Sequence, residues 1–237
     1  MIKKLLTVAI NDFKLAFRDT SLRFFFIFPI LNLVVVRYGF PIAVESFPVL
    51  KDYIHILLMA ATTQGSLMFG FIYSMILIDE KDTQVAKVYG VLPVSKFWFV
   101  VFRLIAPFLL STLATFLMLL VEPYYGLSLF ENLAYSMLAG LVAPMMILFV
   151  ATAAKNKIEG MTWQKLFNLP VSLPLLAFFV PASFSFLFSW LPAYWAYQGF
   201  NELIFDGSFS LYFVIGFVYS LILIGLLARK FSLNHFS

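Results

Sequence analysis

Long apolar runs follow one another through this 237-residue chain and constrain its fold more than any other feature. Hydrophobic residues make up 62% of the chain and charged residues only 12%. Soluble proteins, by comparison, average roughly 25% charged residues. A run of about 20 apolar residues is long enough to cross a hydrocarbon core about 30 Å thick as a helix. Because the runs also lack the period-two alternation of membrane β-strands, the sequence predicts an all-α integral membrane protein.

The spacing of the runs predicts six transmembrane helices. The first begins near residue 24, and the others are expected at about 53–78, 97–121, 132–154, 166–189 and 209–228. The first run is short, since thirteen residues separate Arg23 from Arg37 and span only about 20 Å of helix. Either Arg37 extends its side chain to the far surface, or the helix continues towards Phe40. Prolines inside the third and fourth runs predict kinks, and three prolines predict that the fifth is bent or broken.

Residues 1–22 precede these runs and have an amphipathic pattern. Apolar residues at helical spacing form one stripe and basic residues the opposite face: Ile2, Leu5, Leu6, Ala9, Phe13, Ala16 and Phe17 against Lys3, Lys4, Lys14 and Arg18. Such a helix lies in the membrane interface. A signal peptide is disfavoured because Asn11, Asp12 and Lys14 interrupt the apolar stretch and no small-residue cleavage site follows. We therefore divide the chain into an interfacial helix, 1–22, and a six-helix transmembrane domain, 23–237.

The distribution of basic residues sets the expected orientation. With six crossings, fourteen of the sixteen Lys and Arg fall on one side of the membrane, and only Arg37 and Lys51 fall on the other. Basic residues concentrate on the cytoplasmic side of membrane proteins. Both termini are therefore expected to be cytoplasmic.

A polar segment of nineteen residues, 79–97, separates the second run from the third. We interpret it as a coupling loop, a short stiff element through which another protein moves the membrane domain. Either Asp82 or Thr83 can cap a short helix, Pro93 can end it, and its apolar face would consist of Val85, Val88, Tyr89 and Leu92. A solvated connector is the alternative.

Two further polar segments are notable. In the inner loop 155–165, Glu159 is the only acid among three lysines; it is either a second contact with the same partner or an ordinary surface charge. Gly160 beside it would permit a tight turn. The outer segment 190–208 is rich in aromatic residues and is expected to form an interfacial belt or a short re-entrant helix.

The sequence offers little for catalysis. The chain has no cysteine and two histidines without metal-binding spacing, so no catalytic residue and no metal site are assigned. None of its eleven glycines is followed by lysine, as a phosphate-binding P-loop requires. Its acids avoid the middle of the runs, which disfavours proton-coupled transport. If ATP drives this protein, a separate subunit must bind ATP and Mg²⁺.

Polar residues in the middle of the runs are candidates for a solute path. They include Asn32 in the first run, Thr63 and Gln64 in the second, and Thr112 in the third. Small and hydroxylated residues also let helices approach closely and hydrogen-bond to each other. Packing is therefore the alternative.

Taken in order, these motifs resemble those of the permease subunits of type-2 ABC exporters. The resemblance rests on four segments: Asp79-Glu80-Lys81-Asp82, Val91-Leu92-Pro93-Val94-Ser95, the inner loop 155–160, and Leu191-Pro192-Ala193-Tyr194-Trp195. The inner loop 155–160 and the outer segment 191–195 look like those of the short branch often labelled as drug or fluoroquinolone efflux permeases. The chain departs from the family at Thr83-Gln84, where Gly-Thr is usual.

The resemblance implies a dimer of permeases in the plasma membrane, either two identical chains or two paralogues, bound to two soluble ATPase subunits. The chain itself would be a non-catalytic subunit that moves an amphipathic solute outward: a drug, lipid, peptide or natural product. The alternatives are a stand-alone secondary carrier or channel, and a membrane-embedded enzyme or assembly factor.

Overall fold

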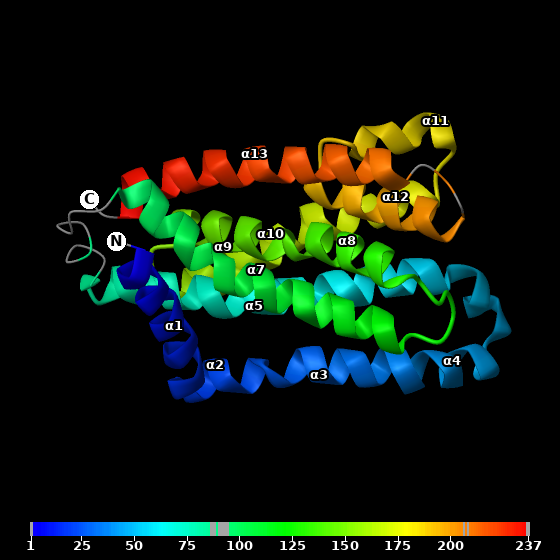
Figure 1. Cartoon of the computed structure of the whole chain (residues 1–237), viewed down its shortest axis with the longest axis horizontal. Coiled ribbons are helices and arrows are strands. Elements are labelled where there is room, and N and C mark those ends of the chain that lie inside the picture. The colour runs from blue at the N-terminus through cyan, green and yellow to red at the C-terminus, as the bar shows by residue number, and fades with distance from the viewer. Residues whose placement is uncertain (1, 86–88, 90–94, 206, 208, 236–237) are drawn as a thin grey trace.

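The structure, a computed structural model, describes residues 2–85, 89, 95–205, 207 and 209–235, and these residues form helices and no strand. The elements before the α5–α7 connection are α1 (Ile2–Arg18), α2 (Thr20–Phe25), α3 (Ile27–Val34), η1 (Val35–Gly39), α4 (Phe40–Ser46), η2 (Pro48–Tyr53) and α5 (Ile54–Asp82). Those after it are α7 (Lys96–Val121), α8 (Leu129–Gly140), α9 (Val142–Ala153), α10 (Lys157–Ser172), η3 (Leu173–Phe178), α11 (Ala182–Ser185), η4 (Phe186–Phe188), α12 (Pro192–Ile204) and α13 (Phe209–His235). Together they make an elongated bundle (Figure 1). The expectation of an all-α protein is confirmed.

Within the part of the chain that the structure describes, five helical stretches are long and apolar enough to span a membrane. They cover Thr20–Ser46, Pro48–Asp82, Lys96–Val121, Leu129–Ala153 and Phe209–Leu233. The first shows how the short first run is accommodated: helical structure continues past Arg37 through a π-helical turn, η1, and through α4. Of the two alternatives for Arg37, the structure therefore supports the longer helix.

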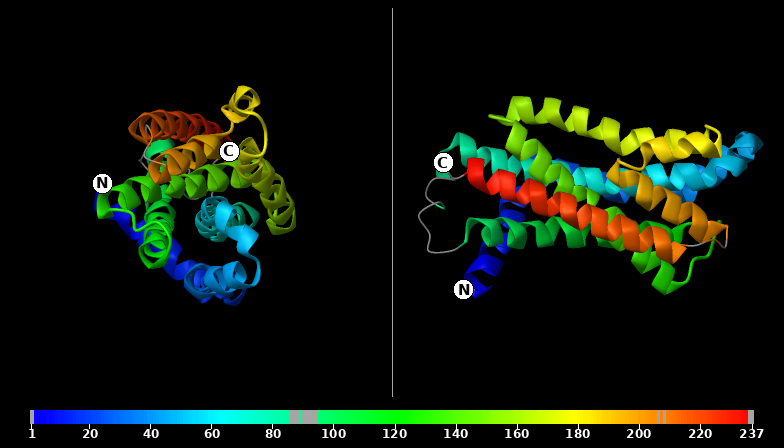
Figure 2. Two further views of the ribbon diagram at one scale, coloured as in Figure 1. Left: turned by 90° about the vertical axis from the view of Figure 1, so that its right-hand side faces the viewer. Right: turned by 90° about the horizontal axis from the view of Figure 1, so that it is seen from above.

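The expected fifth crossing differs most from its sequence-based limits. α10 begins at Lys157, nine residues earlier than expected, and passes at Ser172 into the 3-10 turn η3. The three prolines explain this break, because proline removes a helical hydrogen bond and clashes with the preceding turn. Figure 2 shows α10 and η3 running along one side of the bundle. As this stretch is not among the five, a sixth crossing stays a prediction.

α5 is the central helix, and most of its side chains are buried. It packs against α9, α7, α10 and α3. The expected fourth crossing is divided at Leu141 into α8 and α9, three residues before Pro144. Both halves are largely enclosed, so the core lies along α5 and the α8–α9 pair.

The aromatic segment 190–208 contains a helix, α12, packed against α13, α8 and α10. Tyr197 and Phe200 are fully buried, and the Phe200 ring lies 4.5 Å from that of Tyr135. Trp190, by contrast, is 68% exposed. The expected interfacial belt therefore fits the exposed Trp190, but it does not fit the aromatic residues on the buried face of α12.

The bundle has two dissimilar ends. Both termini, the end of α5, the start of α7 and the turn between α9 and α10 lie at one end, which we call the loop end. There, α1 runs crosswise to the long helices (Figure 1). The connections from α4 to α5 and from α7 to α8 lie at the opposite end.

Candidate functional site: an ionic cluster at the loop end

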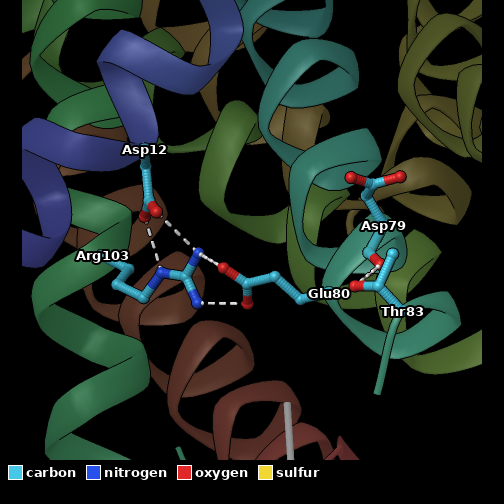
Figure 3. Close-up of polar contacts among 5 residues, drawn as sticks. All are labelled: Asp12, Asp79, Glu80, Thr83 and Arg103. Carbon is cyan, nitrogen blue, oxygen red and sulfur yellow. Dashed lines mark hydrogen bonds and ion pairs between the residues drawn. The ribbon is translucent and has the colours of Figure 1, made fainter. Parts of the chain in front are cut away.

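Three charged side chains from three different helices meet inside the loop end (Figure 3). Arg103 of α7 donates from Nε and Nη2 to the carboxylate of Asp12, at 2.6 and 2.7 Å. It also donates from Nη1 and Nη2 to Glu80, at 2.7 and 2.6 Å. The guanidinium thus makes a two-point contact with each carboxylate, the strongest form of charged hydrogen bonding available to arginine. We call Asp12, Glu80 and Arg103 the ionic cluster.

Helix geometry places each member of the cluster. Asp12 and Ala16 are one turn apart on α1 and are both buried, so they form the face of α1 that contacts the bundle. Glu80 occupies the last turn of α5, and Arg103 lies near the start of α7. The α5–α7 connection therefore begins shortly after one member of the cluster and ends shortly before another.

The cluster is almost completely removed from solvent, with exposed side-chain fractions of 4% for Arg103, 4% for Asp12 and 8% for Glu80. Two carboxylates share one guanidinium, so the ionic cluster as a whole has a formal charge of −1. The rings of Phe99 and Tyr89 also lie near the guanidinium carbon, at 5.5 and 5.9 Å, as favourable cation–π neighbours. Removing one partner from such a buried ionic group costs about 3–5 kcal/mol.

Burial raises the pKa of Asp12 above its ordinary value, and Arg103 offsets only part of this effect. The physical reason is that a desolvated carboxylate loses its hydration, while the guanidinium that should compensate for the loss is shared with Glu80. Asp12 therefore takes up a proton at a higher pH than an ordinary aspartate does.

The predicted coupling residues lie just beyond this cluster, and the start of the loop differs from expectation. Asp82 belongs to the last turn of α5, and Thr83 is the C-terminal cap, donating its hydroxyl to the carbonyl of Asp79 at 2.8 Å. Neither begins a new helix. The chain turns at Gln84, whose φ of 61° lies in the left-handed region.

Two of the predicted apolar contacts can be placed. Val85 is 38% exposed. Tyr89 is partly buried, and its ring lies 5.2 Å from that of Phe99, so this side chain packs on the helical bundle itself. Burial also raises the pKa of the Tyr89 phenol, with the Glu80 charge adding to the effect. Val88, Leu92 and Pro93 lie outside the described residues.

The second inner loop is mostly helix, and its charges are used locally. Glu159 accepts a hydrogen bond from the amide of Lys155 at 2.9 Å, while its own amide donates to Asn156 at 2.9 Å. Gly160 is buried, and a Cβ there would lie 2.6 Å from Ile78. The glycine therefore permits close packing of α10 on α5, not the tight turn that was expected.

Lys157 joins three elements near the ionic cluster. Its Nζ lies 2.7 Å from Asp79 of α5 and 3.8 Å from Asp19, the N-cap of α2. Lys81 adds another link, donating to the carbonyl of Ala154 at 2.9 Å. α10 is thereby tied to α5 and to the α1–α2 junction.

The four candidate solute-path residues have different surroundings in the structure. Thr63 is buried and donates to the carbonyl of Met59, and Thr112 is buried against Gly140. Asn32 is half-buried and donates to the carbonyl of Ala61 at 3.4 Å. Gln64 is exposed in the middle of α5. Helix packing therefore accounts for Thr63 and Thr112. Of the four candidates, Gln64 is the one whose side chain is exposed.

The ionic cluster itself was missed from the sequence. In the sequence, Asp12 interrupts the apolar stretch of residues 1–22, and Arg103 is one of the fourteen basic residues on the same side of the membrane. An acid within an amphipathic stripe was the available signal, but its partner lies 91 residues away. Among the described residues, no group of three or more His, Cys, Asp or Glu could hold a metal ion.

These observations define a class: a multi-pass helical membrane protein whose helices are locked together at one end by buried charges. A family model described as "Fluoroquinolones export permease protein Rv2686c-like" matches residues 12–228, and the chain belongs to this family of drug-efflux permeases of the short ABC type. Two curated relatives are the fluoroquinolones export permease proteins Rv2686c and MT2760 of Mycobacterium tuberculosis strains H37Rv and CDC 1551. Each is 25% identical over 236 residues, covering 95% of this chain and 92% of the relative. No solved structure matches.

Proposed function

We propose that this chain is the permease subunit of an ATP-driven exporter, with six crossings, α1 in the membrane interface, and the loop end in the cytoplasm. Membership of an export permease family supports a transport role. The fourteen Lys and Arg assigned to the loop end support its cytoplasmic position. The partners are two copies of a soluble ATPase, which bind ATP and Mg²⁺, and a second permease chain. The solute is an amphipathic molecule, and Gln64 and Asn32 remain candidates to line its path.

The ionic cluster is the observation that carries this proposal. A loop that receives force from an ATPase has to pass it to several membrane helices at once, and a flexible base would absorb the motion. Glu80 and Arg103 lie on the two sides of the α5–α7 connection and bind each other across its base. Asp12 adds α1 to the same rigid unit. A displacement of the loop would therefore move α1, α5 and α7 together.

The ATPase contact is assigned to Asp82, Thr83, Val85, Val88, Tyr89, Leu92 and Pro93, with Glu159 as a second contact. Val85 offers the sharpest test, because its side chain is exposed. Apolar anchors at interface centres contribute about 2 kcal/mol or more when truncated. We expect Val85→Glu to leave the permease folded but to weaken its co-purification with the ATPase and to reduce solute-stimulated ATP hydrolysis.

Val49→Glu is the matched control, since Val49 is exposed at the opposite end. It should change neither measurement. If Val85→Glu keeps full ATPase binding and full transport, the α5–α7 connection is only a connector. If no ATPase co-purifies with the wild-type permease, a stand-alone carrier becomes the better description.

A further inference from the structure

A cavity of about 350 Å³ lies beside the ionic cluster, between the α1–α2 junction, the end of α5 and the start of α10. Besides Glu80 of the ionic cluster, four charged residues border it: Arg18, Asp19, Asp79 and Lys157. The remaining wall is largely apolar and includes Leu22 and Met75. Glu80 also borders the cavity, but its carboxylate is turned towards Arg103. The carboxylate of Asp79 points away from Arg103 (Figure 3).

The charges around this cavity suit a ligand that carries both signs. Arg18 and Lys157 balance Asp19 and Asp79. Lys157 is shared between the two acids, and Arg18 is exposed and makes no ion pair with any residue that the structure describes. A guanidinium without a partner binds phosphate well. Two carboxylates that share one ammonium can accept hydrogen bonds from a second one.

The position of the cavity indicates where such a ligand would come from. It lies where the crosswise helix α1 meets the ends of the membrane-length helices. Phe13 and Phe17 of α1 are exposed, as expected of a helix that buries an apolar face in the headgroup boundary. With α1 in the membrane interface, as proposed above, the charged rim of the cavity would lie at the depth of lipid headgroups.

We propose that this cavity binds the headgroup of an aminophospholipid of the phosphatidylethanolamine class. Its phosphate would pair with Arg18, and its primary ammonium would donate to Asp79 and Asp19. A choline headgroup has no N–H to donate, and a glycerol headgroup has no cation. The proposal requires the membrane position of α1 but neither ATP hydrolysis nor export.

Lipid titration of the purified permease in detergent, followed by native mass spectrometry and thermal unfolding, tests this site. The probes are phosphatidylethanolamine, phosphatidylcholine and phosphatidylglycerol with identical acyl chains. Wild type should retain phosphatidylethanolamine in preference to the other two and unfold at a higher temperature with it. Asp79→Asn should bind it about tenfold more weakly, the loss expected of one charge-assisted hydrogen bond, and so lose the preference over phosphatidylcholine.

Asp52→Asn is the matched control, because Asp52 is an exposed aspartate of η2 and lies away from the cavity. It should keep the wild-type preference. Arg18→Gln provides a second variant whose folding is not in question, since Arg18 is exposed, and it should weaken binding of all three lipids. Equal retention of phosphatidylethanolamine and phosphatidylcholine by wild type, or unchanged binding by Arg18→Gln, would overturn the proposal.

Discussion

The two ends of the bundle hold their buried charged residues in different ways. At the loop end, charges bind across elements far apart in the sequence: Asp12 and Arg103 are 91 residues apart, and Lys81 and Ala154 are 73 apart. At the opposite end, acids bind their own neighbours. Glu122 accepts from the amides of Tyr124, Tyr125 and Gly126, and Glu131 forms a capping box with Ser128.

This difference indicates how motion is divided in the molecule. Contacts between distant elements must break before those elements can separate, whereas a local cap moves with its own helix. Ionic contacts between distant elements therefore hold the loop end together, whereas the local contacts of Glu122 and Glu131 at the opposite end do not oppose separation of its helices. The proposed exporter, driven from the loop end and releasing solute at the other, requires that arrangement.

Among the predicted changes, replacing Arg103 should lower the stability of the loop end the most. Arg103→Met leaves two buried carboxylates without a cation, and we expect a loss of about 3–5 kcal/mol in unfolding free energy. Thermal unfolding of the purified permease measures this loss. Arg37→Met is the control, because Arg37 is exposed at the opposite end and makes one long bond, 3.4 Å, to a carbonyl.

A rescue variant separates charge from packing in this experiment. Adding Asp12→Asn and Glu80→Gln to Arg103→Met removes the uncompensated charges, so much of the lost stability should return. If Arg103→Met alone is as stable as wild type, the cluster does not hold the loop end together.

Glu122 offers the corresponding test at the opposite end. Glu122→Gln keeps the shape but replaces one acceptor oxygen with an amide group that faces backbone donors, at a cost of about 1–3 kcal/mol. Hydrogen exchange should become faster at residues 124–126 and stay unchanged in α1. Faster exchange in α1 as well would mean that the two ends are coupled through the bundle, contrary to the local character of this site.

The sequence could predict the helices better than the contacts between them. Apolar runs predict membrane helices directly, and the prolines of the fifth run predicted the break that the structure has at η3. The cluster could not be found in this way, because whether Arg103 is a surface charge or a buried one depends on where α1 packs. The role of Gly160 was predicted wrongly for the same reason. A glycine in a polar loop suggests a tight turn, and its close packing against α5 depends on a contact between helices that the sequence does not show.

The pKa of Asp12 gives a smaller test that is specific to the cluster. Burial raises this pKa, so the folded protein takes up a proton at Asp12 at a higher pH than the unfolded chain does. Stability attributable to Asp12 therefore rises as the pH falls through the folded pKa towards the ordinary value, by at most about 1.4 kcal/mol per pH unit. Asp12→Asn cannot titrate and lacks this contribution.

Unfolding of wild type and Asp12→Asn between neutral and mildly acidic pH measures the effect. The stability difference should shift in favour of wild type on acidification. Asp52→Asn, which removes an exposed carboxylate outside the cluster, should show no such shift relative to wild type. A shift in the opposite direction would mean that Arg103 holds the Asp12 pKa below its ordinary value.

Lys157 should give the smallest effect, and salt distinguishes it from the buried cluster. Its side chain is 39% exposed and that of Asp79 is 52% exposed, so solvent and ions screen their attraction, and Lys157→Met should cost only about 0.2–1 kcal/mol. The hydrogen bond to Asp79 raises the pKa of Lys157, so Lys157 keeps its positive charge at neutral and mildly alkaline pH. Unfolding in low and high salt should show the stability difference between wild type and Lys157→Met shrinking as salt rises. The difference between wild type and Arg103→Met should persist under the same conditions. If both differences respond equally to salt, the loop end is held by surface charge throughout, and its contrast with the opposite end is one of sequence distance alone.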